Sequence, residues 1–226
     1  MHKLIKEAKE AGRSLLENEA NSLLKEFSLP VIDCYLTSTP EEAVAAAEEL
    51  GYPVVMKVVS SQIIHKSEAG GVKLNLKTAE EVQKAYQEII QNAKAFNPKA
   101  QVEGILVTPY LPDGTEVIIG MTTDPQFGPV MMFGLGGIFV EVFKDVSFKL
   151  APLSIEEARE MIKNVKGYTI LQGVRGQKAK YTEGLADALV KLSQLVTANP
   201  EIKEIDLNPV VVFEDSIAIL DARILL

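Results

Sequence analysis

Cysteine, histidine, tryptophan and excess positive charge are scarce or absent in this sequence of 226 residues. One cysteine, Cys34, excludes an intramolecular disulfide, fits a reducing compartment and predicts a cytoplasmic protein. A net charge of −8 leaves no broad positive field for nucleic acid, so no nucleic-acid partner is expected. The longest nearly uncharged stretch, residues 128–140, falls short of the roughly 20 apolar residues that span a bilayer. We therefore expect no membrane partner either.

Several widespread active-site signatures are missing as well. The chain has no P-loop pattern G-x-x-x-x-G-K-[ST], no G-x-G-x-x-G after a strand, no H-E-x-x-H, no C-x-x-C and no G-x-S-x-G. A composition of 47% hydrophobic and 24% charged residues is nevertheless typical of a folded globular protein. The length allows one or two compact domains. Any nucleotide chemistry must therefore use a fold other than the common ones.

Hydrophobic periodicity and local capping signals predict a mixed order of helices and strands, an α/β fold. Ser14, Thr78 and Ser154 each precede a glutamate by three positions, as in a capping box, and Thr39 precedes Pro40. Helices are expected over residues 15–27, 40–50, 79–96, 155–165 and 185–197. Strands are expected over residues 31–36, 53–59, 72–76, 105–108, 116–122, 130–133, 138–143, 202–212 and 217–220, the last two as a hairpin.

Two lobes are expected to meet in a short loop near residues 105–110, because the sequence has no internal repeat and no long linker. The first lobe would span about residues 15–107 and the second lobe residues 108–226.

Lys57 and His65 are the first candidate functional residues. Lys57 interrupts an apolar, β-branched run, so it either reaches water at the sheet edge or meets a fixed anion such as a phosphate. The following loop, residues 60–71, contains His65 and ends on two glycines. A neutral imidazole can act as a nucleophile or a base, and glycines permit close backbone approach. The combination favours a functional loop over an ordinary surface histidine.

Two glycine-rich stretches have two interpretations each. Gly134, Gly136 and Gly137 follow a predicted strand, where bare amides can bind an anion or simply form a tight turn. Arg175 lies between two glycines, Gly173 and Gly176, where its guanidinium suits a phosphoryl group, although exposed loop arginines are common. Both interpretations stay open from these residues alone.

The carboxy-terminal part carries a pattern of oxygen ligands. Residues 204–209 read Glu-Ile-Asp-Leu-Asn-Pro, so Asp206 and Asn208 share one face of a strand. Asp221 ends the next predicted strand, where a hairpin would bring it beside them. Carboxylate and amide oxygens are ligands that Mg²⁺ accepts together with substrate phosphates and water. The alternative is the solvated face of an edge strand, and the pattern favours the metal.

Together these stretches resemble one family, the ATP-grasp β subunits of ADP-forming acetyl-CoA synthetases, which are NDP-forming acyl-CoA ligases. The similarity runs from about Leu15 to the end of the sequence. It is carried by residues 15–20, 53–57, 65–72, 114–137, 143–147 and 204–209. The resemblance implies an ATP-grasp fold over residues 1–226, in which two lobes clasp a nucleotide.

The resemblance also implies roles for individual residues. Lys57 would contact the triphosphate, and Glu116 would hold the ribose hydroxyls. Backbone groups of Thr108, Tyr110 and Leu111 would meet adenine, although Pro109 lacks a donor and leaves the choice of amide open. Gly136 and Gly137 join the expected nucleotide-binding set. Asn208, Asp221 and Asp206 would hold Mg²⁺.

The implied reaction converts acyl-CoA, ADP and phosphate into acid, CoA and ATP, reversibly. It proceeds through an acyl phosphate and phosphohistidine, with His65 as a second phosphate carrier and Arg175 assisting the transfer to ADP. The implied partner is a CoA-binding α subunit in an α₂β₂ heterotetramer, and the chain alone is expected to be inactive.

Other functions remain open at this point. A succinyl-CoA-synthetase-like subunit, or the matching domain of a fused protein acetyltransferase, would also use an ATP-grasp fold. A nucleotide-binding regulatory module would bind without turnover, and a purely structural subunit would not bind nucleotide at all.

Overall fold

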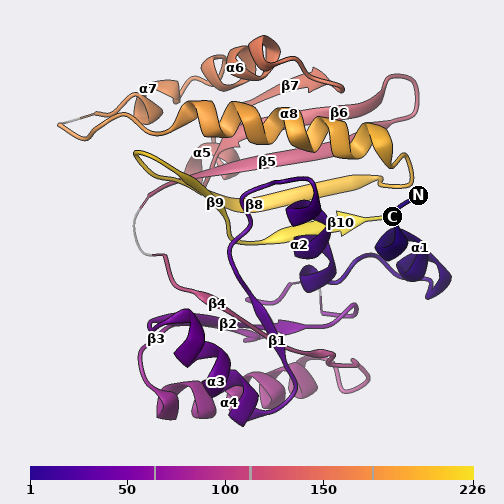
Figure 1. Ribbon diagram of the computed structural model, residues 1–226, viewed down its shortest axis with the longest axis vertical. Coiled ribbons are helices and arrows are strands. Elements are labelled where there is room, and N and C mark those ends of the chain that lie inside the picture. Colours follow the sequence, from indigo (N-terminus) through magenta and orange to yellow (C-terminus); the bar gives the residue numbers. More distant parts are fainter. Residues whose placement is uncertain (64, 112–113, 175) are drawn as a thin grey trace. The chain divides into compact units, whose positions relative to one another are not determined.

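The computed structural model describes residues 1–63, 65–111, 114–174 and 176–226. The chain divides into two compact units (Figure 1). The small unit is Ile32–Pro112, and the large unit combines Met1–Val31 with Asp113–Leu226. Residues 15–31 were expected in the first lobe, but they pack in the large unit, where Leu23 and Leu24 are completely buried in the core.

The small unit is an antiparallel sheet in the strand order β1-β4-β2-β3, with helices α3 and α4 packed on it. Its elements are β1 (Tyr35–Thr37), α3 (Pro40–Leu50), β2 (Val54–Val59), β3 (Val72–Leu76), α4 (Ala79–Phe96) and β4 (Gly104–Pro109). Thr39 and Thr78 cap the two helices, as predicted, by accepting hydrogen bonds from Glu42 N and Glu81 N. Met56 and Val58 of β2 join the core under the helices. Alternation therefore sets Lys57 on the other face of the sheet.

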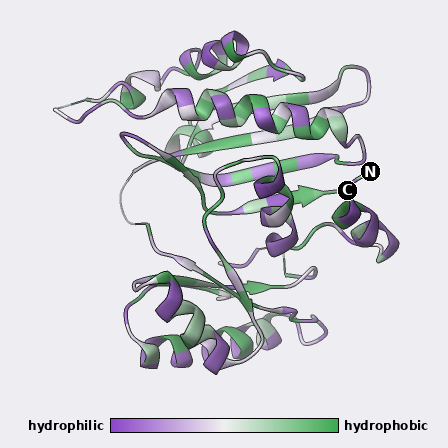
Figure 2. Ribbon diagram, in the orientation of Figure 1, coloured by the Kyte–Doolittle hydropathy of each residue, from purple (hydrophilic) through white to green (hydrophobic). Residues whose placement is uncertain are grey.

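The large unit is a sheet in the order β10-β8-β5-β6-β7, with β9 beside β8. Its first elements are α1 (Lys3–Glu10), α2 (Glu17–Glu26), β5 (Thr115–Asp124), β6 (Gly128–Leu135), α5 (Ile138–Glu141) and β7 (Val146–Leu150). The others are α6 (Ile155–Lys163), α7 (Tyr168–Leu171), α8 (Thr182–Ala198), β8 (Glu204–Val212), β9 (Ile217–Ile219) and β10 (Ala222–Leu225). Figure 2 shows hydrophobic residues along the central strands and hydrophilic residues over the outer helical surfaces.

One face of the large sheet is buried under helices. Ile119 of β5, Phe133 of β6 and Leu207 of β8 pack with Leu189 and Leu192 of α8 in one core. Because strand side chains alternate, the residues between them lie on the opposite face. That opposite face carries the polar residues of β8.

Early and late parts of the chain are joined by hydrogen bonds in the large unit. His2 N donates to Asn199 Oδ1 (3.3 Å), and Leu226 N donates to Ser14 Oγ (3.4 Å). Ile219 N donates to Pro30 O (2.9 Å). The predicted capping box at Ser14 is therefore wrong. Helix α2 begins at Glu17, after Leu16, whose N–H is held by the carboxylate of Glu19.

The predicted strand over residues 138–143 is also wrong, because the chain forms helix α5 there. Gly137 has a φ of +59°, and Val140 N donates to Gly137 O, so the glycine turn directs the chain into a helical turn. The capping box at Ser154 is confirmed at the start of α6. Elements α1, β7, α7 and β10 were not predicted from the sequence. Across the described residues, every helix is too short or too polar to cross a membrane.

Candidate functional site

Lys57 lies in the middle of β2, a strand that is buried along its whole length. Only 8% of Lys57 is exposed, and Leu106 of β4 lies directly opposite it. A buried ammonium group is costly unless an anion or oxygen acceptors surround it. The position fits the predicted contact with a phosphate.

The segment predicted to meet adenine follows the end of β4. Thr108 is buried and pairs with Val55 in the ladder between β4 and β2. The N–H of Tyr110 donates to Pro53 O (3.0 Å), so it is engaged within the small unit. Pro109 has no N–H. Among the four residues, Leu111 is therefore the best candidate for a donor to adenine.

His65 is exposed in a loop whose two sides are anchored in the small unit. Ile63 and Ala69 of this loop are buried in the core under α3 and α4. Asn92 Nδ2 of α4 donates to Gly70 O (3.0 Å). A Cβ on Gly70 would lie 2.8 Å from Asn92 Nδ2, so a glycine is needed for this approach. The anchored loop presents an accessible imidazole.

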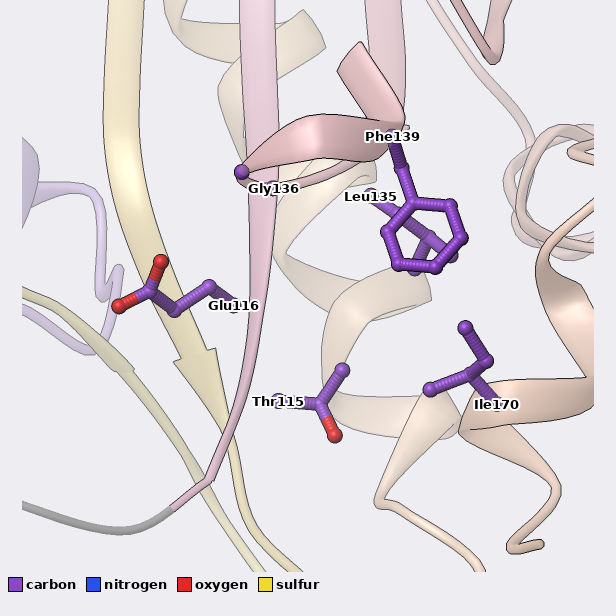
Figure 3. Close-up of a pocket in the computed structure, with 7 residues that line it drawn as sticks. Thr115, Glu116, Leu135, Gly136, Phe139 and Ile170 are labelled. Carbon is purple, nitrogen blue, oxygen red and sulfur yellow. The ribbon is translucent and has the colours of Figure 1, made fainter. Parts of the chain in front are cut away.

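A pocket of about 230 Å³ lies at one end of the large sheet (Figure 3). It is lined by Thr115, Glu116, Leu135, Gly136, Gly137, Phe139 and Ile170. The side chains of Leu135, Phe139 and Ile170 gather on one side of β5, and the carboxylate of Glu116 points to the other side. The wall of the pocket is therefore apolar, and the exposed carboxylate of Glu116 is open to a ligand with hydroxyl groups on the other side of β5.

Gly136 and Gly137 have different roles in this pocket. Gly136 N donates to Glu116 O (2.8 Å), and a Cβ on Gly136 would lie 2.9 Å from the Cβ of Glu116. Gly136 therefore allows close packing against Glu116, and its N–H is already hydrogen-bonded. A Cβ on Gly137 would meet nothing within 4 Å, and its φ of +59° is one that glycine adopts without strain. Open space for a ligand thus lies at Gly137.

Asp206 and Asn208 lie on β8, and Asp221 lies between β9 and β10. Ile205 and Leu207 belong to the core, so Asp206 and Asn208 lie on the opposite face. The N–H of Asn208 donates to the carbonyl oxygen of Asp221 (3.2 Å). The residues that the hairpin was expected to bring together are thus neighbours.

The electrostatics of Asp206 fit an acidic cluster. Burial raises the pKa of Asp206 above its ordinary value, Arg223 opposes this shift, and Asp221 and Glu204 add to it. Arg223 lies directly opposite Asp206 in β10. A cation bound beside Asp206 would relieve the repulsion between the carboxylates.

These oxygen donors fit Mg²⁺ better than a metal whose ligands all come from protein side chains. Within residues 1–63, 65–111, 114–174 and 176–226, no three histidine, cysteine, aspartate or glutamate side chains converge to hold a metal. Mg²⁺ usually takes one or two carboxylates and completes its shell with water and phosphate oxygens. Asp221, Asn208 and Asp206 supply oxygen donors of that kind.

The predicted residues fall into three groups. Lys57, Thr108, Tyr110 and Leu111 lie on β2 and β4 or just after β4 of the small unit, and His65 lies in its loop. Glu116, Gly136 and Gly137 meet at the pocket, and Asp206, Asn208 and Asp221 meet at β8. Arg175 lies outside the described residues.

Sequence reasoning missed the apolar wall of the pocket. Phe139 was assigned to a strand, and Ile170 lies in α7, which was not predicted. Four-residue helices have no periodicity of their own to detect. The glycines at positions 136 and 137, directly before α5, were the available signal in the sequence.

Comparisons with known proteins identify the family. Residues 7–226 match the family described as the ATP-grasp domain. The chain is 52% identical over 223 residues to the acetate–CoA ligase [ADP-forming] I subunit beta of Pyrococcus furiosus, covering 99% of this chain and 96% of that protein.

Solved structures give the same result. An acetyl-coenzyme A synthetase 1 of Ca. Korarchaeum cryptofilum, in complex with coenzyme A, Ca-AMPCP and HgCl⁺, matches with a TM-score of 0.96 at 51% identity, covering 99% of this chain and 98% of that chain. A second structure of that enzyme, with coenzyme A and Mg-AMPPCP, matches with a TM-score of 0.87 at 48% identity, covering 99% of this chain and 98% of that chain. In it, a phosphohistidine segment points towards the nucleotide-binding site. The chain therefore belongs to the ATP-grasp family and, within it, to the β subunits of ADP-forming acetate–CoA ligases.

Proposed function

We propose that this chain is the nucleotide-binding β subunit of an ADP-forming acyl-CoA ligase and transfers a phosphoryl group from His65 to ADP. The complete reaction converts acyl-CoA, ADP and phosphate into acid, CoA and ATP, and it is reversible. The observation that carries the proposal is the 52% identity with a subunit of that name over 99% of this chain. Because 96% of that relative is covered, the similarity extends to the whole subunit.

The transfer from His65 is a single phosphoryl exchange. The N–P bond of phosphorylated His65 breaks, a bond forms between phosphorus and a β-phosphate oxygen of ADP, and the imidazole is regenerated. The exposure of His65 supports this role, because the imidazole must accept and release a phosphoryl group. Lys57 and Arg175 would neutralise charge on the transferred group.

Three of the predicted residues would bind the nucleotide. Glu116 would accept hydrogen bonds from ribose hydroxyls, and the N–H of Leu111 would donate to adenine. The engaged N–H of Tyr110 supports the assignment to Leu111. Gly137 would leave room for the phosphates.

Asn208 and Asp221 would hold Mg²⁺, with Asp206 beside them. The bound cation would neutralise phosphate charge and orient the diphosphate. Its use is supported by the oxygen donors at β8 and by the Mg-AMPPCP complex of the Korarchaeum enzyme.

A CoA-binding α subunit is the proposed partner, in an α₂β₂ heterotetramer, and the chain would not turn over without it. The description of the Pyrococcus relative as a β subunit supports a partner chain. The matches favour neither a regulatory module nor a succinyl-CoA-synthetase-like subunit. The cytoplasmic location stays a prediction. Mass measurement after co-expression tests the assembly, and failure of the two chains to associate would reject it.

Phosphorylation of His65 by ATP, the reverse half-reaction, tests the chemistry on this chain alone. We expect acid-labile labelling by γ-labelled Mg·ATP in the wild type and none in His65→Ala. His2→Ala is a matched control, because His2 caps α1 and contacts Glu26. In the assembled enzyme, His65→Ala should abolish ATP formation and leave ADP binding nearly intact. Undiminished turnover by this variant would reject the relay.

A further inference from the structure

Asp145 is a buried carboxylate that the proposed reaction does not use. It lies between α5 and β7, and only 6% of it is exposed. Its Oδ1 accepts a hydrogen bond from Lys166 N (2.7 Å), and its Oδ2 accepts one from Gly167 N (2.8 Å). Its own N–H donates to Phe139 O (3.1 Å). One residue thus contacts two segments that are more than 20 positions apart in sequence.

These two segments adjoin residues that line the pocket. Phe139 belongs to α5, and Ile170 belongs to α7, which begins directly after Gly167. Each helix has four residues, too few to be stable without outside contacts. Asp145 supplies such contacts to both, through its backbone to α5 and through its carboxylate to the turn before α7.

Gly167 shows how closely the turn approaches the pocket. A Cβ on Gly167 would lie 2.3 Å from Leu135 Cδ1 and 3.3 Å from Asp145 Oδ2. Leu135 lines the pocket, so any side chain on Gly167 would displace a residue of the pocket wall. The absence of a side chain lets the turn reach Asp145 without this displacement.

The same contacts reach the proposed nucleotide residues. Gly136 and Gly137 connect β6 to α5, and Gly136 N is bonded to Glu116 O (2.8 Å). A shift of α5 would pull on this connection and displace the backbone of Glu116. His65 belongs to the other unit and takes no part in these contacts.

We propose that Asp145 is a positioning residue for the pocket, setting the affinity for ADP by tying α5 and the turn before α7 together. The proposal rests on the proposed function, because it needs ADP to bind beside Glu116. Gly167 contributes to the same arrangement, since its lack of a side chain leaves Leu135 undisturbed in the pocket wall.

Steady-state kinetics of the enzyme assembled with its partner subunit separates positioning from a merely structural role. For Asp145→Ala we expect the KM for ADP to rise about tenfold or more, with kcat within about threefold of the wild type. Partial unfolding would instead lower the apparent kcat and leave KM unchanged. Asp145→Asn keeps one acceptor oxygen and should restore part of the affinity.

Asp124 provides a matched control. Its Oδ1 accepts hydrogen bonds from Gln126 N (2.7 Å) and Phe127 N (2.9 Å) in the exposed turn between β5 and β6. Asp124→Ala should therefore leave the KM for ADP unchanged. Gly167→Ala tests the same pocket without altering a carboxylate. If Asp145→Ala does not fold, this variant alone tests the proposal. Its KM for ADP should also rise.

An unchanged KM in both Asp145→Ala and Gly167→Ala would overturn the inference while leaving the proposed function intact. An unchanged KM in Gly167→Ala alone would overturn it if Asp145→Ala does not fold. Absence of Mg·ADP binding by the wild-type chain in calorimetry would overturn the proposed function and the inference with it. A KM raised equally by Asp124→Ala would also count against a specific role for Asp145.

Discussion

Gly136 and Glu116 lie so close together that the effect of one added carbon can be worked out from the structure. In Gly136→Ala, the new Cβ would lie 2.9 Å from the Cβ of Glu116 and 3.0 Å from its carbonyl oxygen. Ordinary contacts begin at 3.4 Å, so the two segments must separate by about 0.5 Å. The hydrogen bond from Gly136 N to Glu116 O, now 2.8 Å, would lengthen accordingly.

The cost has two parts. Overpacking costs about 1–3 kcal/mol, and a weakened hydrogen bond costs up to about 0.5–1.5 kcal/mol. At about 2–4 °C per kcal/mol for a chain of this size, the melting temperature should fall by roughly 3–18 °C. Displacement of Glu116 should also remove about one hydrogen bond to the ribose, which raises the Kd for ADP about tenfold.

The assay combines thermal unfolding with calorimetric titration of Mg·ADP. Gly128→Ala is the matched control, because Gly128 has a φ of +76°, open space around it, and a position at the far end of the β5–β6 pair. It should lose about 1–2 kcal/mol of stability from the strained backbone and bind ADP normally. Wild-type affinity in Gly136→Ala, with the expected loss of stability, would refute the link between Gly136 packing and Glu116.

Three further predictions concern other parts of the chain. Asp206→Asn should raise the melting temperature at neutral pH, because burial raises the pKa of Asp206 and its ionised form is therefore less favourable in the folded state. The gain should disappear as the pH falls below 3.8, where the unfolded carboxyl also binds a proton, and a gain that grows on acidification would contradict the sign. Lys57→Met should raise the Kd for ADP about tenfold to a hundredfold, because it removes one charge-assisted hydrogen bond. Equal ADP titration curves for the variant and the wild type would exclude the phosphate contact. Ser154→Ala should cost about 1 kcal/mol through loss of the cap on α6, with unaltered ADP binding; a melting curve equal to that of the wild type would show that the cap is dispensable.

Local signals in the sequence were sufficient where the stabilising partner lies within one helical turn. Thr39, Thr78 and Ser154 cap their helices through the residue three positions later, so the sequence itself contains both partners. Ser14 shows the same pattern and fails, because its hydroxyl accepts a hydrogen bond from Leu226 instead. That partner is 212 positions away and has no local signature.

The candidate site also has a part that local sequence signals predict and a part that depends on tertiary contacts. The alternation of Asp206 and Asn208 and the return of the chain at Asp221 follow from strand geometry, and their adjacency was predicted. The apolar wall of the pocket was not, because its helices are held by tertiary contacts to Asp145. The division of the chain was also beyond local reasoning, since the packing of α2 against β10 joins segments nearly 200 positions apart.

The discontinuous make-up of the large unit has a consequence during synthesis on the ribosome. Ser14 emerges 212 residues before its partner Leu226, which corresponds to about 10–40 s at 5–20 residues per second. During that interval the small unit can fold, whereas Leu23 and Leu24 of α2 still lack the strand they will cover. The nascent chain therefore exposes the apolar face of α2, which is a natural target for chaperones.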